Sequence, residues 1–353
     1  MKIRSSLKNI FLLIISSIFS VIFMEVIIRL FFEISGKKRL FKADPVIGWI
    51  PKENVKYTKK LLSSSKREYK VNYSTDNNGF RFISEKKGIN SKSNPRKRIL
   101  VIGDSFTGGL YSSDDKSWFA YLDEGLNLDV FAYGIPGSGT LQQWLVYKNL
   151  KKIIKPDILL IQACTNDIFN DSLEYSYKTI SRNQALRAPY LKDEKIYYRD
   201  EIYVKIYRFL LNRSNFFYLV DYQLSVLQSK FFNVKDLLND ENLDKAIANW
   251  EKIYSNYINE VKNDGVQEIW SVNCGSSIDP RIEIKNFNTW ISSSKKNDLR
   301  IFVKPNDKIY QEFLNNKDVY VLGGGHLSDI GNKIFGKSLV EEIKLKKINI
   351  LNN

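Results

Sequence analysis

The residues of this chain that could do chemistry begin with a serine and a histidine. Ser105 follows Gly103 and Asp104 at the end of the apolar run 99–102, so we expect its hydroxyl at an exposed turn. A serine hydroxyl is a weak nucleophile at neutral pH and needs a neighbouring general base. His326 is the only histidine among the 353 residues, so it alone can supply an imidazole. The pair is suited to nucleophilic attack on an acyl carbon.

Two further residues could stabilise the oxyanion that such an attack creates. Preorganised N–H donors aimed at the developing negative charge are the usual device. The candidates are the backbone amides at Ser105 and Gly134 and the side-chain amide of Asn166. Gly134 would also let a substrate approach the main chain closely, because it has no Cβ. Each of these residues is ordinary by itself, and their combination indicates a site.

Mostly apolar strands separated by helix-length segments must position these residues. Such a pattern is typical of a parallel sheet covered on both faces, and the ligand site of such a sheet lies beyond the carboxyl ends of its strands. Strands are predicted at 99–102, 129–133, 158–161, 266–272 and 319–322. Helices are predicted at 142–154, 242–263 and 327–345. Each candidate residue lies just after one predicted strand, which favours a single site at one edge of the sheet.

The order of these residues resembles the SGNH/GDSL hydrolase superfamily, whose four sequence blocks carry Ser, Gly, Asn and His. The resemblance covers most of the chain from Asp44 onward, except the segment 170–240, and the N-terminal layout is similar to that of membrane-anchored bacterial members. Cys164 and Thr165 stand where the family often has a Gly before the Asn. The matching segments are Gly103-Asp104-Ser105-Phe106-Thr107, Tyr133-Gly134-Ile135-Pro136-Gly137, Asn166-Asp167 and His326-Leu327-Ser328.

The resemblance implies an α/β fold, a flavodoxin-like α/β/α sandwich with a parallel five-stranded sheet. It also implies hydrolysis of an ester with no metal and no organic cofactor. Ser105 would be the nucleophile and His326 its base, with Ser105, Gly134 and Asn166 forming the oxyanion hole. The substrate implied is an acylated carbohydrate or lipid, often one that carries acetyl groups.

One position departs from the family pattern. The family usually has an Asp two or three residues before the His, where this chain has Gly324 and Gly323. In a triad that Asp fixes the histidine tautomer and stabilises the imidazolium. We therefore expect a Ser105–His326 dyad, with a backbone carbonyl accepting the second ring N–H. Asp318 and Asp329 are the alternative acceptors.

The N-terminus predicts an uncleaved signal anchor. Basic residues precede an uncharged run at 10–24, no small-residue cleavage site follows, and Glu25 can pair with Arg29 one helical turn later. At about 1.5 Å per residue, the stretch 10–32 is long enough to cross a bilayer. This predicts a single-pass protein of the cell membrane with its catalytic domain extracytoplasmic, although Lys37 and Lys38 place positive charge on the far side too.

The domain organisation follows from these segments. We predict a cytoplasmic tail and transmembrane anchor at 1–40, a connecting module at 41–97, and an SGNH hydrolase-like domain at 98–349. A polar run at 84–97 is typical of a linker. The aromatic-rich segment 170–240 is too long for a plain loop, so we interpret it as a helical insertion that forms a cap or lid. A partner-binding surface is the alternative.

The composition and the cysteines limit the possible partners and the possible disulfides. The formal charge of +15 comes from lysines scattered through the chain, and no nucleic-acid-binding motif accompanies it, so no nucleic-acid partner is expected. Cys164 and Cys274, the only cysteines, follow strands that we expect to be neighbours. A disulfide requires Cα atoms within about 7 Å. We predict two buried free thiols, with a Cys164–Cys274 disulfide as the alternative.

Three functions from different classes stay open. An esterase that removes acyl groups, chiefly acetyl, from an envelope or exported carbohydrate or lipid comes first. An O-acyltransferase using the same dyad comes second. A catalytically weak, glycan-binding or scaffold protein comes third, and the missing Asp favours it.

Overall fold

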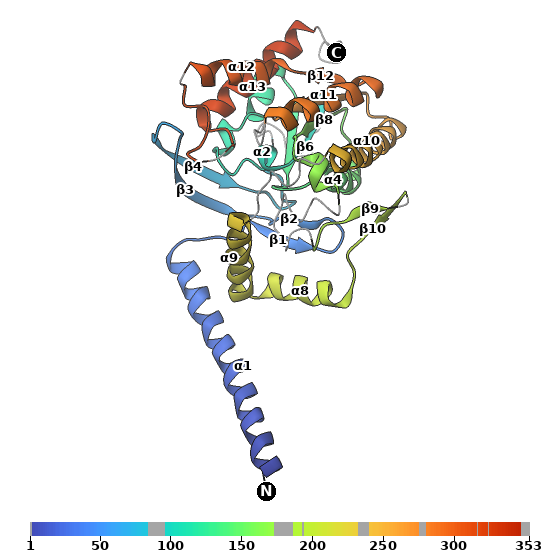
Figure 1. The fold of residues 1–353 in the computed structure, drawn as a ribbon. Coiled ribbons are helices and arrows are strands. Elements are labelled where there is room, and N and C mark those ends of the chain that lie inside the picture. The colour runs from blue at the N-terminus through green and yellow to red at the C-terminus, as the bar shows by residue number, and fades with distance from the viewer. Residues whose placement is uncertain are drawn as a thin grey trace.

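The computed structural model describes residues 2–83, 96–172, 186–192, 194–231, 240–274, 280–315, 317–323 and 325–346. A long helix projects from a globular part, as Figure 1 shows. The predicted linker lies mostly at 84–95, outside the described residues, as do parts of the predicted insertion and Gly324.

A central sheet carries the globular part, with strand order β12-β11-β8-β6-β7-β5. Its first five strands are parallel, and β5 (Phe82–Ile83) joins the edge antiparallel to β7. The predicted parallel five-stranded sheet is therefore confirmed. The parallel strands are β6 (Arg98–Gly103), β7 (Asp129–Gly134), β8 (Ile158–Ala163), β11 (Glu268–Asn273) and β12 (Arg300–Phe302).

The identity of the fifth parallel strand corrects the sequence prediction. Residues 319–322 form only two isolated antiparallel bridges, Ser63 with Val321 and Tyr320 with Leu327. The edge position that they were expected to fill belongs to β12, which pairs with β11. Residues 319–322 are apolar because Val319 and Val321 are buried, although neither belongs to a strand of the sheet. A short apolar run is compatible with a sheet strand and with a buried segment outside any sheet, so its periodicity cannot distinguish the two.

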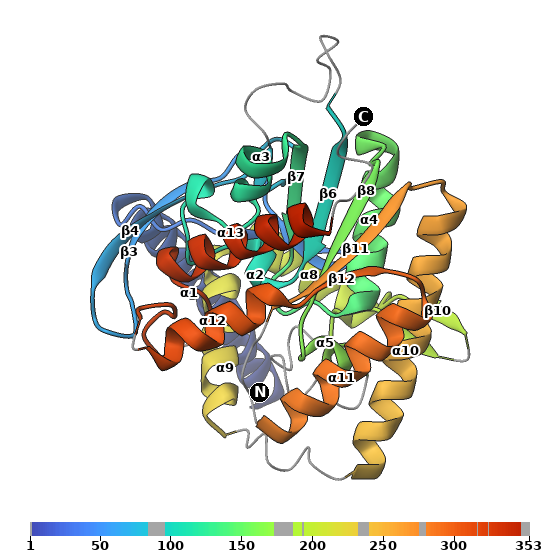
Figure 2. The same cartoon turned by 90° about the horizontal axis from the view of Figure 1, so that it is seen from above.

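Helices cover both faces of the sheet, as Figure 2 shows. Alternate residues of β6 point to opposite cores: Leu100 and Ile102 pack with one helix layer, and Ile99 and Val101 with the other. The first layer contains α4 (Thr140–Ile154), α5 (Asp167–Asn170), α10 (Asp240–Asn263) and α11 (Pro280–Lys296). The second contains α3 (Ala120–Leu126), α12 (Lys304–Leu314) and α13 (Asp329–Leu345). The three predicted helices correspond to α4, α10 and α13.

The connecting module consists of two antiparallel hairpins and the edge strand β5. It packs onto the loops at the carboxyl ends of the sheet strands: Trp49 Nε1 donates to Pro136 O at 3.0 Å, and Tyr69 OH donates to Tyr111 O at 3.1 Å. The module therefore lies at the edge where a site is expected. Its hairpins are β1 (Phe41–Asp44) with β2 (Gly48–Pro51), and β3 (Lys56–Leu62) with β4 (Glu68–Ser74).

The described part of the insertion contains a short hairpin and two helices. The hairpin is β9 (Tyr190–Lys192) with β10 (Lys195–Tyr197), and the helices are α8 (Ile202–Arg213) and α9 (Asn215–Phe231). In Figure 1 these helices lie at the base of the sheet domain, with α9 beside the upper end of the projecting helix α1 (Lys2–Ile34) and α8 extending away from it. Within α1, residues Lys8–Ile34 are long and apolar enough to cross a membrane, with a mean hydropathy of 2.6.

Candidate active site

Ser105 is the first residue of the short helix α2 (Ser105–Gly108), directly beyond the carboxyl end of β6. Asp104 caps this helix, because its Oδ1 accepts a hydrogen bond from the backbone N–H of Phe106 at 3.0 Å. Ser105 is half-buried, whereas its neighbours Asp104 and Phe106 are buried. The Gly-Asp-Ser turn therefore presents the serine hydroxyl at the carboxyl edge of the sheet, as the sequence predicts.

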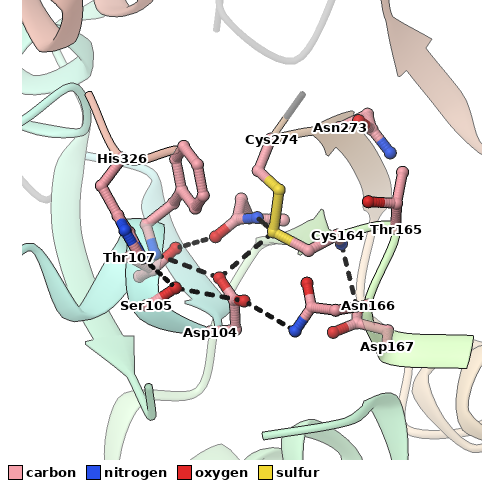
Figure 3. Close-up of a disulfide and its surroundings, with 12 residues drawn as sticks. Asp104, Ser105, Thr107, Cys164, Thr165, Asn166, Asp167, Asn273, Cys274 and His326 are labelled. Atoms are coloured by element: carbon pink, nitrogen blue, oxygen red, sulfur yellow. Dashed lines mark hydrogen bonds between the residues drawn. A yellow bond between two sulfur atoms is a disulfide. The ribbon is translucent and has the colours of Figure 1, made fainter. Parts of the chain in front are cut away.

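His326 reaches the same point from the loop before α13. Its Nε2 lies 2.8 Å from Ser105 Oγ, a hydrogen-bonding distance within the range expected for a nucleophile and its base (Figure 3). The imidazole stacks against two rings, with centroids 5.1 Å from Phe106 and 4.4 Å from Tyr111. These stacking contacts fix the orientation of the imidazole ring in addition to the loop that carries it.

The surroundings of His326 favour its neutral form. Burial lowers its pKa to about 4, and the ammonium of Lys59 adds to the shift. Lys59 lies on β3 of the connecting module, with its Nζ 5.0 Å from the centroid of the Tyr111 ring. Burial and the nearby Arg81 lower the pKa of Lys59 as well. At neutral pH the imidazole is uncharged and ready to accept a proton.

Neither of the two alternative acids contacts the histidine. Asp318 Oδ2 accepts from Arg67 Nε at 3.0 Å, and Asp329 Oδ1 accepts from Arg67 Nη2 at 2.5 Å. Arg67 thereby ties both ends of the His326 loop to the β3–β4 hairpin. Among the described residues, the ring of His326 is seen to hydrogen-bond only Ser105. The expected carbonyl acceptor is not found there, and Gly324 lies outside those residues.

The expected oxyanion donors surround Ser105. Its own amide lies in the first turn of α2, where a backbone N–H has no partner inside the helix. Asn166 Nδ2 is directed toward Asp104 Oδ2, at 3.4 Å, and that oxygen lies 3.3 Å from Ser105 Oγ (Figure 3). Gly134 ends β7 beside Gly103 of β6. Their role as an oxyanion hole stays a prediction.

The structure gives a different reason for glycine at position 134. A Cβ there would lie 2.0 Å from the backbone nitrogen of Gly108 in α2. That contact is far too short, so the missing side chain makes room for α2 and not for a substrate. Glycine at 134 is thus needed to place the helix that carries Ser105.

Asp104 connects the parts of the site. Its carboxylate accepts from Phe106 N and Asn166 Nδ2 and lies beside the Ser105 hydroxyl. Burial raises the pKa of Asp104 to about 6, although these hydrogen bonds oppose the shift. Burial also raises the pKa of Asp167, and the charge of Asp104 adds to that shift. The sequence pattern predicts Asp104 only as part of a turn, whereas in the structure its hydrogen bond with Asn166 connects two strand ends.

A disulfide links Cys164 and Cys274, whose Cα atoms lie 5.2 Å apart. This finding replaces the favoured reading of two buried thiols. The expected adjacency of their strands is confirmed, because β8 and β11 pair in parallel up to Ala163 and Asn273. The bridge lies behind Asp104, with Cys164 Sγ 3.2 Å from Asp104 Oδ1 (Figure 3).

Sequence reasoning missed two residues that shape the site, Tyr111 and Lys59. No spacing rule relates them to His326, because they come from the loop after α2 and from the connecting module. In the described parts of the chain, no three His, Cys, Asp or Glu side chains form a group that could hold a metal ion.

The lowered pKa of His326 predicts the pH dependence of activity. A general base works only when unprotonated, so kcat/KM should fall on the acid side with a midpoint near pH 4, well below the ordinary histidine value of about 6.5. Lys59→Met removes a charge that opposes protonation, so this midpoint should move to higher pH. The measurement is kcat/KM from about pH 3.5 to 9.

Asp104→Asn is the control for that profile, because Asp104 has a pKa of about 6 and asparagine can still accept from Phe106 N. An acid limb that moves with Asp104→Asn but not with Lys59→Met would belong to Asp104. If the acid-side midpoint of kcat/KM lay near the ordinary histidine pKa and did not move in Lys59→Met, the assignment to a buried His326 would be contradicted.

A parallel α/β/α sandwich with a serine and an imidazole paired at its carboxyl edge defines the class of ester-bond hydrolases built on this fold. The model of the GDSL-like lipase/acylhydrolase family matches residues 99–339. The chain therefore belongs to this GDSL (SGNH) family. The match contains all four candidate residues, Ser105, Gly134, Asn166 and His326.

Solved structures of several esterases are similar to this chain. The acetyl xylan esterase AlAXEase is 13% identical, covering 70% of this chain and 99% of its own, with a TM-score of 0.42. A mutant of Axe2, an acetyl-xylooligosaccharide esterase from Geobacillus Stearmophilus, is 13% identical over 72% and 96%, with a TM-score of 0.40. The lipase/acylhydrolase from Enterococcus faecalis is 15% identical over 71% and 96%, with a TM-score of 0.39. No curated protein matches the chain.

Proposed function

We propose that this protein removes acetyl groups from an envelope or exported carbohydrate by means of a Ser105–His326 dyad. The observation that carries the proposal is the 2.8 Å contact between Ser105 Oγ and His326 Nε2 in a chain of the GDSL family. The pair lies at the carboxyl edge of the sheet, where parallel α/β folds bind ligands.

The chemistry follows from the placement of these groups. Ser105 Oγ attacks the acyl carbon while its proton passes to His326 Nε2. The amides of Ser105 and Gly134 and the Asn166 side chain stabilise the oxyanion. His326 returns the proton to the departing alcohol, which leaves an acyl-serine. A water molecule, deprotonated by His326, then releases the acid and restores the serine.

Among the described residues no carboxylate is hydrogen-bonded to His326, and a base without such a partner is weaker. An acid on Nδ1 would stabilise the imidazolium that forms as Ser105 attacks. Here aromatic stacking with Phe106 and Tyr111 orients the ring instead. The imidazole is therefore well oriented, but no negative charge stabilises the imidazolium that forms on it. We expect turnover to be slower than that of a full triad.

The space beside the dyad favours a small acyl group. Ser105 and His326 line a cavity of about 10 Å³ together with Phe106, Tyr111 and Leu327. That volume is close to the space that one water molecule occupies. A methyl group is close to this size, and we expect a longer acyl chain to press against the rings of Phe106 and Tyr111 that line the same cavity.

The disulfide supports an extracytoplasmic location. Disulfides form and persist in oxidising compartments and are rare in the cytosol. Cys164 and Cys274 are the only cysteines of the chain, and they are bridged. With α1 as a single span and the domain outside the cytoplasm, the enzyme is placed to act on polymers of the cell envelope.

A series of acyl chain lengths tests the proposed substrate. We expect kcat/KM for p-nitrophenyl acetate to exceed that for the butyrate by about tenfold and that for the octanoate by more, because each added methylene has to be forced into packed surroundings. Phe106→Ala, which enlarges the cavity, should reduce the preference. Equal or faster hydrolysis of the octanoate would contradict an acetyl-sized pocket.

The same assay separates hydrolysis from transfer. Oligosaccharide acceptors added to the p-nitrophenyl acetate reaction compete with water for the acyl-enzyme. Acetate as the main product supports the esterase. Acetylated sugar as the main product would make the chain an acyltransferase with the same dyad.

A further inference from the structure

One helix of the insertion has an apolar face that no other described part of the chain covers. In α8, the side chains of Ile202, Ile206 and Phe209 are 72%, 53% and 60% exposed. Their spacing of four and three residues puts them on one side of the helix. Tyr203, 54% exposed, adjoins them. We call these four residues the α8 apolar face.

The opposite side of α8 is fixed to the connecting module. Val204 and Leu211 are buried, and Asn212 makes two hydrogen bonds to the backbone of Ala43 in β1, at 2.8 and 2.9 Å. The helix therefore cannot roll over to bury its apolar face against the globular part. A large exposed apolar patch of this kind marks an interaction surface.

The corner between α8 and α9 is bonded to the membrane-spanning candidate α1. The carboxylate of Glu25 accepts hydrogen bonds from Ser214 Oγ at 2.6 Å and from the backbone N–H groups of Asn215 and Phe216 at 3.0 and 2.9 Å. Arg29 Nη2 donates to Arg213 O at 3.1 Å. The predicted pairing of Glu25 with Arg29 is confirmed at 2.6 Å.

These contacts set the height of α8 along α1. Glu25 directly follows the uncharged run 10–24, and the apolar stretch expected to cross the bilayer continues to residue 32, about 10 Å further along α1 at about 1.5 Å per residue. The start of α9 and the end of α8 are therefore at the level of the upper acyl chains, just below the point where the span 10–32 ends. Figure 1 shows α8 running across the direction of α1, at the base of the globular part and on the side from which α1 projects.

Basic residues predominate on the domain side of this level. Where α1 meets the connecting module there is a pocket of about 630 Å³, and its lining combines four lysines and one arginine with two carboxylates: Lys37, Lys38, Arg39, Lys52 and Lys56 with Glu33 and Glu53. Arg213, at the end of α8, is exposed with its guanidinium 5.7 Å from the centroid of the Phe209 ring. Apolar side chains edged by cations are typical of helices that lie on anionic lipid surfaces.

We propose that α8 is an interfacial membrane helix, which lies in the plane of the bilayer surface with the α8 apolar face among the upper acyl chains. The proposal rests on α1 spanning the membrane. A span alone leaves the globular part free to rotate and tilt. With α8 as a second contact, the sheet domain is held in one orientation above the lipid.

Site-directed spin labelling of the full-length chain tests this arrangement. Single cysteines are introduced at Ile206 and Phe209 in α8, at Ile14 in α1, and at Lys337 as an exposed control on α13. The native cysteines are bridged and do not take the label. The protein is reconstituted in nanodiscs of phosphatidylethanolamine and phosphatidylglycerol, and collision of each nitroxide with oxygen and with a water-soluble nickel chelate is measured.

We expect labels at 206 and 209 to give an oxygen-to-nickel collision ratio at least about threefold above that at 337, approaching that at 14. A lipid-like ratio at 14 with a water-like ratio at 206 and 209 would overturn the interfacial helix and leave the span intact. A water-like ratio at 14 would overturn the span itself. If labels at 206 and 209 collided little with either reagent, the α8 apolar face would be covered by a protein partner and not by lipid, and the proposal would be wrong.

Discussion

Ser105→Ala is expected to lower kcat/KM for p-nitrophenyl acetate by at least about 10³-fold, because no other group can form the acyl intermediate. The same variant should no longer react with a fluorophosphonate probe. The structure motivates both expectations, since Ser105 Oγ is placed 2.8 Å from the only imidazole of the chain. Hydrolysis and labelling are measured on the purified full-length protein.

Ser292→Ala is the matched control, since Ser292 is exposed on α11 and lies outside the proposed site. It should keep wild-type labelling and hydrolysis. If Ser105→Ala retained labelling or near wild-type hydrolysis, the dyad would not be the catalytic site, and the scaffold reading would gain support.

Removal of the disulfide is expected to destabilise the folded domain by about 2–5 kcal/mol. The bridge closes a loop between positions 110 residues apart, and loops of that length give the largest entropic stabilisation in the chain-entropy model. The double variant Cys164→Ser/Cys274→Ser should therefore unfold at lower urea concentration. Equilibrium unfolding followed by intrinsic tryptophan fluorescence measures the difference.

Wild-type protein treated with dithiothreitol is the control for the serine substitutions. It should show a similar loss, because both samples lack the bridge. Alkylation addresses location at the same time. Cells are lysed directly into denaturant, because both cysteines are buried in the folded protein, and the two cysteines should then react with maleimide only if a reductant is added. Unchanged stability in the double variant, or free thiols in cells, would contradict a structural disulfide in an oxidising compartment.

The sequence predicted the sheet well because its strands are long and continuously apolar. Strands β6, β7 and β8 are buried on both faces, so the segments 99–102, 130–132 and 158–161 are continuously apolar, and polar residues occur only near the strand ends. Strand β12 escaped prediction because Arg300–Phe302 is only three residues long and begins with an exposed arginine. The run at 319–322 wrongly predicts a strand, because a buried segment that belongs to no sheet has the same apolar pattern.

The order of the four family residues was readable, but the contacts that tune them were not. Lys59 and Tyr111 come close to His326 only after the β3–β4 hairpin folds over the sheet edge. The disulfide likewise depends on the neighbouring placement of β8 and β11, which the pattern predicts, and on the final distance, which it does not. Single-sequence reasoning locates strand ends and leaves long-range side-chain contacts open.

Arg67 forms ion pairs with both Asp318 and Asp329, and these determine where the chain can be truncated without loss of the site. A fragment starting at residue 98 would keep the four family residues and the parallel strands. It would also expose the edge of β7 that β5 now covers, and it would release the loop that carries His326. The smallest portable catalytic unit therefore begins near residue 41, and swaps between related enzymes should exchange the hairpins together with the sheet domain.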